Sequence, residues 1–437
     1  MKSLVAALSI ALSLFLGVGA EVHAQEPSPS ISAPAPSIAP NTDPATATRA
    51  WLDTVPADKR EKSDAYFEGG YWLILWSFLL GAAISIFLLA SRISARLRDF
   101  AERATRFKAM QVALYSIAFI LLTAVLSFPF TVYQEFFREH KYGLATQTFG
   151  PWLLDQIKAL GFGLIGIPIF LIVLYAVFRK APRTWWIWAT GVVVFFQLFA
   201  SFILPVFVLP AFNKYTPLEE PVLRDSILAL ARANQIPVDK VFVVDASRQT
   251  TRVSANVAGF LGTTRIALND NLLKQCTLPE IREVMGHEMG HYVLNHGMKL
   301  ALYFGIFYFV GFGLIRSGFG AAVRRWGERW GVRGIADPAG LPLLALFFGA
   351  YFFLLTPLTN TAIRVTESEA DIFGLNTSRE PDGFAKVALK LGTYRKLDPT
   401  PIEEFFFFDH PSGRARIRMA MDWKAAHLPC GDSETSP

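Results

Sequence analysis

Long apolar runs separated by short charged connections dominate the first half of the chain. Four such runs cover about 71–90, 109–132, 160–178 and 185–210. Each is long enough to cross a hydrocarbon core of about 30 Å as a helix. Two more apolar runs follow, at about 300–315 and 341–363. The pattern predicts six membrane helices, two of them inserted into an otherwise more polar C-terminal region.

The N-terminus has a different pattern. Lys2 precedes a short apolar run that ends in small residues, which predicts a signal peptide over 1–24, with an uncleaved first membrane helix as the alternative. Residues 25–65 begin rich in Pro, Ala and Ser and are expected to form a disordered spacer. We expect an N-terminal membrane domain over 66–210 and a second domain over 211–437.

The stretch 211–300 has mixed polarity and predicts an α+β arrangement. Residues 221–234 show the spacing of an amphipathic helix, and "KVFVVDA" at 240–246 is typical of a strand. The segments "VSANVAGF" and "TTRIALND" are expected to pair as a hairpin. The pattern "TLPE" at 277–280 resembles a capping box with Pro in the first turn, so a helix should begin there.

Composition supports the membrane interpretation. Of the 437 residues 52% are hydrophobic and 38 are Phe, which is too apolar for an ordinary soluble enzyme. The net charge of +6 comes from basic residues at the ends of apolar runs, not from a continuous basic face, so no nucleic-acid partner is expected. Two cysteines, Cys276 and Cys430, form neither a disulfide framework nor a CxxC pair.

Basic residues gather in alternate connections between the apolar runs. They are Arg92, Arg96, Arg98, Arg103, Arg106 and Lys108; then Arg179, Lys180 and Arg183; then Arg316, Arg324, Arg325, Arg329 and Arg333. By the positive-inside rule these three connections are cytoplasmic. The stretch 211–300 and the tail 364–437 then face the other side, in agreement with an export signal. We therefore expect a multi-pass protein of a bacterial-type inner membrane, with its second domain on the non-cytoplasmic side.

The sequence "GHEMGH" places His287 and His291 four residues apart on the helix that follows "TLPE". Side chains at i and i+4 project from one helix face, so both rings can reach one Zn²⁺ at about 2.0–2.1 Å. Glu288 lies off that face, as a general base acting on a metal-activated water must. Gly286 and Gly290 each cost a helix up to ~1 kcal/mol, which predicts a close approach of substrate or a second helix. The alternative is a pair of helix-surface histidines.

A catalytic zinc site keeps three protein ligands and one open position. The metzincin continuation is excluded, because Leu294 and Gly297 stand where that motif needs Gly and His. His296 lies five residues after His291, so we expect it to point elsewhere on the helix and to be structural.

The third ligand is expected in "RVTESEAD", directly after the last apolar run. Glu367 and Asp371 are i and i+4 on one helix face, whereas Glu369 points about 200° away from Glu367. We assign Glu367 as the ligand and Asp371 as the partner that orients a ligating histidine. The alternative is an acidic pair on a solvated face. This assignment puts the zinc within roughly 15 Å of the bilayer boundary.

Six spaced motifs together resemble the CAAX prenyl protease 1 family, which are integral-membrane zinc endopeptidases with bacterial heat-shock quality-control relatives. These motifs are "FNKYTPL", "VFVVDASRQTTRVSANVAGF", "RIALNDNLL", "VMGHEMGHYVLNH", "RVTESEAD" and "DHPSGRARI". Together with "REHKYGLATQTFGPWLLDQIK", they extend the resemblance over roughly 109–425. The resemblance implies a mainly α membrane protein, a bundle or barrel of about six or seven transmembrane helices around a chamber, with a small α+β zincin-type metalloprotease domain.

The resemblance also implies one Zn²⁺ per chain and matches each assigned residue to a role. The ligands match His287, His291 and Glu367, the base matches Glu288, and the orienting carboxylate matches Asp371. The His-Pro…Arg tail motif of the family matches His410 and Arg416, which are expected near the scissile carbonyl.

Oxyanion stabilisation is the expected role of His410, and a cap on the final helix is its alternative. Substrate is expected to add as a strand beside 254–259, which includes Ala255 and Asn256. Arg364 is expected to support the site or contact substrate. The edge reads Ser-Ala-Asn where the family has Asn-Ala-Tyr, which leaves side-chain specificity open but not backbone pairing.

The sequence therefore predicts a membrane-embedded zinc endopeptidase that cleaves membrane-associated or misfolded proteins, with the lipid bilayer as its second partner. One alternative is CAAX-type processing of prenylated C-terminal peptides. That activity conflicts with a zinc domain outside the cytoplasm, where the arginines place it. A catalytically inactive membrane scaffold or transporter with a vestigial zinc site is the other alternative.

Overall fold

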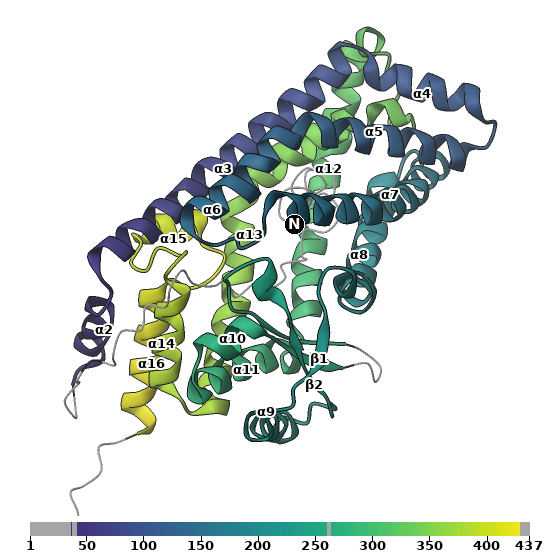
Figure 1. The fold of residues 1–437 in the computed structure, drawn as a ribbon. Coiled ribbons are helices and arrows are strands. Elements are labelled where there is room, and N and C mark those ends of the chain that lie inside the picture. The colour runs from purple at the N-terminus through teal and green to yellow at the C-terminus, as the bar shows by residue number, and fades with distance from the viewer. Residues whose placement is uncertain (1–35, 37–41, 260–263, 429–437) are drawn as a thin grey trace, which may run out of the picture.

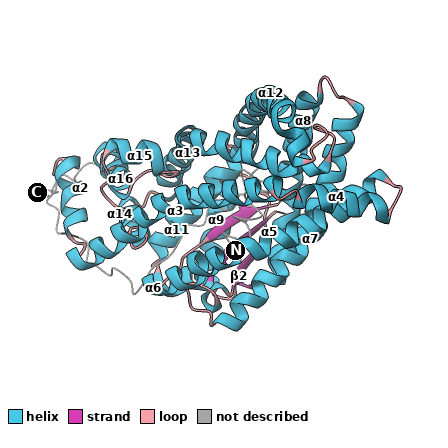
Figure 2. Ribbon diagram, turned by 90° about the horizontal axis from the view of Figure 1, so that it is seen from above, coloured by secondary structure: helices cyan, strands magenta, loops and turns pink. Residues whose placement is uncertain are grey.

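The computed structural model of the protein describes residues 36, 42–259 and 264–428; the signal peptide expected over 1–24 lies outside these. Helices make up most of the fold, and the strands are confined to one small region (Figures 1 and 2). The helices are α2 (Pro44–Asp53), α3 (Ala57–Ala90), α4 (Ile93–Ala104), α5 (Lys108–Thr131), α6 (Arg138–Tyr142), α7 (Phe149–Lys180), α8 (Trp185–Ile203), α9 (Pro221–Ala233), α10 (Asp270–Gln275), α11 (Leu278–Val293), α12 (His296–Trp330), α13 (Leu341–Ser378), α14 (Pro381–Leu391), α15 (Pro401–Phe407) and α16 (Gly413–His427).

Six helical stretches of the described chain are long and apolar enough to cross a membrane. They are Ala57–Ala90, Lys108–Tyr142, Phe149–Lys180, Trp185–Ala211, His296–Trp330 and Pro338–Ser378. They match the six apolar runs one for one; five of them extend well beyond their runs, whereas Trp185–Ala211 ends one residue past its run. Their inner faces pack into one apolar core that includes Tyr115, Tyr175 and Tyr308, while large apolar side chains remain exposed on their outer faces. Such outer faces are what lipid contact requires.

Two of the three basic connections are tied together at the end of the bundle far from the sheet (Figure 1). The buried Arg98 of α4 donates to Asp337 Oδ2 at 2.6 Å and to the Gly331 carbonyl at 2.8 Å. Nearby, Arg333 donates to Glu102 at 2.9 Å. Arg98 is thus a structural residue of this end, whereas the basic residues around it remain at the surface.

The segment predicted as a spacer over 25–65 is helical from Pro44 onward, so that prediction is wrong for its second half. Asp43 caps α2, and Trp51 and Leu52 of this helix are buried in a core shared with α14 and α16. The helix α3 then starts at Ala57 rather than at the apolar run. Hydropathy misses both elements because they bury their apolar side chains against the C-terminal helices instead of lipid.

The sheet contains four strands in the order β1-β2-β4-β3. They are β1 (Tyr215–Pro217), β2 (Val241–Val244), β3 (Ala255–Ala258) and β4 (Arg265–Asn269). β2 pairs with β4 in parallel, whereas β3 and β4 pair antiparallel as the predicted hairpin requires. Among the described residues β3 pairs only with β4, so its other side is an open edge.

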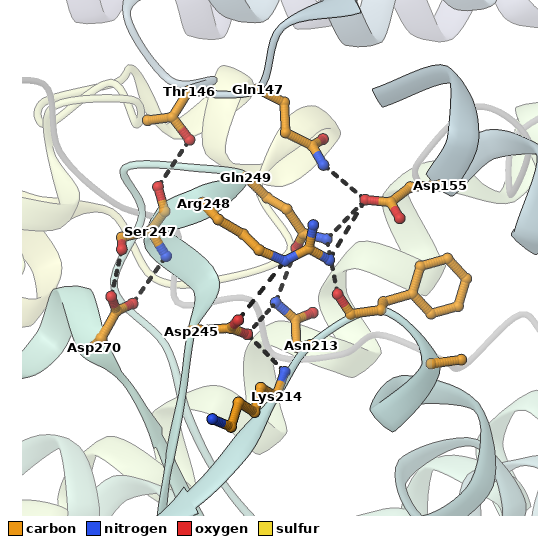
Figure 3. Close-up of polar contacts among 12 residues, drawn as sticks. Thr146, Gln147, Asp155, Asn213, Lys214, Asp245, Ser247, Arg248, Gln249 and Asp270 are labelled. Atoms are coloured by element: carbon orange, nitrogen blue, oxygen red, sulfur yellow. Dashed lines mark hydrogen bonds and ion pairs between the residues drawn. The ribbon is translucent and has the colours of Figure 1, made fainter. Parts of the chain in front are cut away.

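A polar cluster joins the membrane helices to the sheet (Figure 3). At its centre the Asp155 carboxylate of α7 accepts hydrogen bonds from Gln147 at 2.7 Å and Gln249 at 3.0 Å. Asp245, which follows β2, accepts from the Lys214 backbone N–H at 2.7 Å. Because these carboxylates are satisfied by donors from both sides, the cluster fixes the sheet under the membrane helices.

Candidate metal centre

The helix α11 starts where the capping pattern predicted. Thr277 and Glu280 form a capping box, and the Glu280 carboxylate accepts the Thr277 backbone N–H at 2.6 Å. The Glu280 carboxylate also accepts a hydrogen bond from Lys390 Nζ of α14 at 2.8 Å, which neutralises its buried charge. The first turn of α11 is therefore held in place, and the positions of His287 and Glu288 along the helix follow from it.

The two glycines of α11 meet a second helix, α13. A Cβ built on Gly286 would lie 3.1 Å from the Cα and O atoms of Gly374, and one on Gly290 would lie 3.2 Å from the Cα of Ala370. Contacts this short are tighter than most Cβ contacts in proteins, so α13 would have to shift by a few tenths of an ångström to admit a side chain at either position. The close approach brings Glu367 and its neighbours on α13 beside the histidines of α11.

The three expected ligand groups lie together, with one donor atom of each within 4.8 Å of the others. The Nε2 atoms of His287 and His291 are 3.1 Å apart. They lie 3.4 and 3.5 Å from the two carboxylate oxygens of Glu367. Tetrahedral ligands at about 2.0–2.1 Å from one zinc ion would be separated by roughly 3.3–3.4 Å. The three groups are therefore close enough together to hold a zinc ion between them.

The ring of His287 is oriented by Asp371, which lies on the side of the ring opposite Glu367. His287 Nδ1 donates to Asp371 Oδ1 at 2.8 Å, which turns Nε2 toward Glu367 as the atom available for a metal. Arg416 of α16 donates to Asp371 Oδ2 at 2.9 Å and lies 3.4 Å from Glu367. A cation at this position balances two buried carboxylates that would otherwise repel each other.

His291 is held by His296, which was expected to point away from it. His296 Nδ1 lies 2.9 Å from His291 Nδ1, and His296 Nε2 lies 3.0 Å from Glu369, which also binds Lys299. The expectation that His296 points elsewhere is wrong because α11 does not continue through it. Asn295 adopts a left-handed conformation, with φ of 53°, that ends α11 and starts α12 in a new direction.

The pKa values of His287 and His291 also favour a cation between these two rings. Burial opposes charge on His287, but its contacts with Asp371 and Glu367 prevail and raise its pKa to about 10. Burial and the neighbouring charge of His287 lower the pKa of His291 to about 3. Without a metal the pair thus holds one additional proton and a single positive charge at neutral pH, in the place where a metal ion would supply positive charge.

Glu288 is buried beside the three ligand groups, and its Oε1 has no hydrogen-bond partner among the described residues. Burial raises the pKa of this carboxyl to about 8, and a cation held by its neighbours would lower that value. An unpartnered carboxylate of this kind can accept and return a proton near neutral pH.

His410 and Arg364 lie on a second side of the centre. His410 Nε2 is 3.2 Å from Glu367 Oε2 but makes no hydrogen bond there, while its Nδ1 lies 2.7 Å from Asp409. Arg364 does not reach the three ligand groups. Instead it donates to the carbonyls of Glu404 and Phe408, just before His410. It therefore fixes the loop that carries His410.

Ala255 and Asn256 lie on the open edge strand β3, which packs against α11. The Asn256 Oδ1 atom is buried and has no hydrogen-bond partner among the described residues. An open strand edge beside a metal centre can take an extended peptide as an additional strand.

The fold and this centre together define a membrane-embedded metalloendopeptidase. Two family models divide the chain between them. "CAAX prenyl protease N-terminal, five membrane helices" matches residues 43–214, and "Peptidase family M48" matches residues 217–424. The chain belongs to the M48 family of peptidases.

Relatives and a solved structure agree with this placement. The chain is 32% identical to the uncharacterized metalloprotease YhfN of Bacillus subtilis, over 78% of this chain and 82% of that protein. It is 29% identical to CAAX prenyl protease 1 of Saccharomyces cerevisiae, over 73% and 74%. The crystal structure of S. mikatae Ste24p matches with a TM-score of 0.68 at 24% identity, covering 85% of this chain and 90% of that one, which confirms the predicted fold class.

Proposed function

We propose that the protein binds one Zn²⁺ through His287, His291 and Glu367 and hydrolyses peptide bonds in membrane-associated or misfolded proteins. The observation that carries the proposal is the cluster of His287, His291 and Glu367, with one ligand atom of each within 4.8 Å of the others, beside the unpartnered carboxylate of Glu288. Family members are zinc metalloproteases, which supports zinc over other cations.

The ion, when bound, would supply Lewis-acid polarisation of the scissile carbonyl and acidify a water molecule. Glu288 would accept the proton of the attacking water at its carboxylate and pass it to the nitrogen of the leaving amine. His410 Nε2, which makes no hydrogen bond in the described chain, would donate to the developing oxyanion. Asp371 and Arg416 would hold the His287 ring in the ligating tautomer.

Substrate would bind as a strand beside Ala255 and Asn256, since the outer edge of β3 pairs with no other strand of the described chain and β3 adjoins α11. Main-chain pairing of this kind depends little on side-chain identity. It suits a protease that acts on misfolded chains of varied sequence.

The orientation that we propose places the metal centre outside the cytoplasm of a bacterial-type inner membrane. The three basic connections lie at the ends of α3, α7 and α12, which successive crossings put on one side, and the positive-inside rule makes that side cytoplasmic. The signal-like N-terminal sequence supports the same orientation.

CAAX-type processing is the second candidate, favoured by the 29% identity to CAAX prenyl protease 1 of S. cerevisiae. A farnesylated peptide and the same peptide without the lipid would separate the two functions. A strong preference for the farnesylated form would favour CAAX-type processing, whereas equal cleavage would favour the general endopeptidase.

The proposal is tested by Glu288→Gln, with the exposed Glu219→Gln as the matched control. The Glu288 variant is expected to keep about one zinc per chain and to lose at least ~10³-fold in cleavage rate, because the proton acceptor is gone. Zinc content by mass spectrometry and cleavage of an unfolded protein in detergent are the measurements. Undiminished cleavage would refute the mechanism. Stoichiometric zinc in a wild-type protein without chelator-sensitive cleavage would favour the inactive scaffold.

A further inference from the structure

The short helix α15 exposes large apolar side chains directly before the loop of His410. Its sequence is "PIEEFFF", and the exposed fractions are 72% for Ile402, 43% for Phe405 and 45% for Phe406. Isolated apolar side chains are common on protein surfaces, but three on seven residues form a patch that needs a partner.

The polar residues of α15 face the protein, which is the reverse of a water-exposed helix. Glu403 accepts Lys396 and the Thr400 backbone N–H, both at 2.8 Å. Glu404 accepts the Ser412 backbone N–H at 3.0 Å. Both acids are thus paired on the inner side while the apolar side chains point outward, an arrangement that favours an apolar medium over water.

The patch lies at the same depth as lipid-facing side chains of a membrane helix. The Asn360 side chain of α13 donates to the Phe406 carbonyl at 2.9 Å. Leu358 and Leu354, which are 51% and 78% exposed, precede Asn360 by two and six residues on the same helix. At 1.5 Å per residue these side chains lie within about 10 Å of Asn360 along the helix axis. Helical phase turns these leucines about 120–160° around the α13 axis from Asn360, so they share a level with α15 and not a face. The apolar side chains of α15 therefore lie at the depth where the apolar exterior of α13 ends.

The inner side of this segment is firmly packed. Phe407 stacks on Tyr71 of α3 with ring centroids 3.9 Å apart, and Phe408 packs on Phe67 at 4.6 Å. Arg364 binds the backbone around them. The exposed residues of α15 are therefore held outward by a fixed backbone.

We propose that α15 is an interfacial anchor, whose Ile402, Phe405 and Phe406 insert into the bilayer at the boundary between headgroups and acyl chains. Apolar side chains on a helix that lies along the surface bury themselves about 5–10 Å into this boundary. His410 follows Phe406 by four residues. The anchor therefore holds the His410 loop at a fixed height on the lipid surface, a consequence that goes beyond the proposed cleavage and does not depend on the substrate.

The experiment uses the full chain with Cys276→Ser and Cys430→Ser, reconstituted in vesicles of phosphatidylcholine and phosphatidylglycerol. Single cysteines replace Ile402 or Phe406 and carry a nitroxide spin label. Leu354→Cys is the lipid reference, and Ala425→Cys, exposed on α16, is the water reference. Collisions with oxygen, which concentrates in lipid, and with a water-soluble nickel chelate report the surroundings of each label.

Both test labels are expected to collide with oxygen several-fold more often than with the chelate, as at Leu354. Collision ratios like that at Ala425 would overturn the proposal, and so would labels shielded from both reagents, because a second protein would then cover the patch. The two positions are read independently, so failure of one variant to fold leaves the other. Since the readout does not involve cleavage, it is independent of the proposed function.

Discussion

At the scale of single residues, the proton retained by His287 and His291 is a measurable property. The pKa of His287 is raised to about 10, so at lower pH a binding metal ion must displace one proton from the ring. We expect zinc affinity to rise about tenfold per pH unit between pH 6.5 and 8.5, as measured by competition with a chelating fluorophore. Affinity that does not change with pH would contradict this proton count.

Glu283 gives a stability prediction at a residue outside the proposed ligand set. Burial raises its pKa to about 8, and Ser378 donates to its carboxyl. Between the unfolded value near 4.5 and about 8, the folded state alone keeps the proton. The contribution of Glu283 to the free energy of unfolding is therefore complete below pH 4.5. It is lost as the pH rises through 8, and the loss is at most roughly 5 kcal/mol.

The variant Glu283→Gln keeps the shape of this side chain but does not titrate. We expect the melting temperature of the wild-type protein in detergent to fall between pH 6 and 9, whereas the Gln variant changes less. Glu219→Gln, at an exposed position, serves as the control and should follow the wild type. Parallel pH profiles of all three proteins would show that Glu283 is ionised throughout.

The sequence could predict which residues meet at the centre but not all that hold them. Glu367 and Asp371 were deduced from helical spacing, because residues i and i+4 share a face in any regular helix. His296 was missed since its contact with His291 depends on the left-handed Asn295, a break that periodicity does not show. The Asn before a helical run was the signal available, because Asn tolerates this conformation.

At the scale of elements, the contact of α11 with α13 determines how far the two histidines of α11 lie from Glu367 of α13, the three proposed ligands. Replacing Gly286 by Ala would place a Cβ 3.1 Å from the backbone of Gly374. We expect the helices to be pushed apart, destabilising the protein by about 1–3 kcal/mol and weakening zinc binding at least tenfold. Thermal melting and zinc competition test both effects.

Gly297→Ala is the matched control, because a Cβ at this helical position of α12 meets no atom within 4 Å. Alanine is a better helix former than glycine, so this variant should be neutral or slightly more stable. If Gly286→Ala behaved in the same way, the close approach of the two helices would have no energetic role.

Elements were predictable where burial in lipid or in the sheet produces a clear periodic pattern. The strands β2 and β4 and the capped start of α11 appeared as expected. The helix α2 and the first turns of α3 did not, since their polar sequence is stabilised by distant helices. Ser63, for example, donates to the Arg395 carbonyl at 3.1 Å, a contact between residues 332 positions apart.

At the scale of the whole molecule, the proposed orientation can be tested with two single cysteines in the Cys276→Ser, Cys430→Ser background. Ala425→Cys lies near the C-terminus, and Glu328→Cys lies at the basic end of α12. In intact cells a membrane-impermeant maleimide is expected to label the first and not the second, because the basic end is retained inside. Labelling of Glu328→Cys alone would place the metal centre in the cytoplasm.

The helix α13 runs from its apolar crossing through Glu367 to Ser378 without interruption, and its 38 residues correspond to about 57 Å. The carboxylate that we propose as a zinc ligand is thereby attached to a helix whose depth is set by lipid thickness. A thicker or thinner bilayer would shift the cutting position relative to the headgroups. If Glu367 is the ligand, we expect the enzyme to select peptide bonds partly by their distance from the membrane surface.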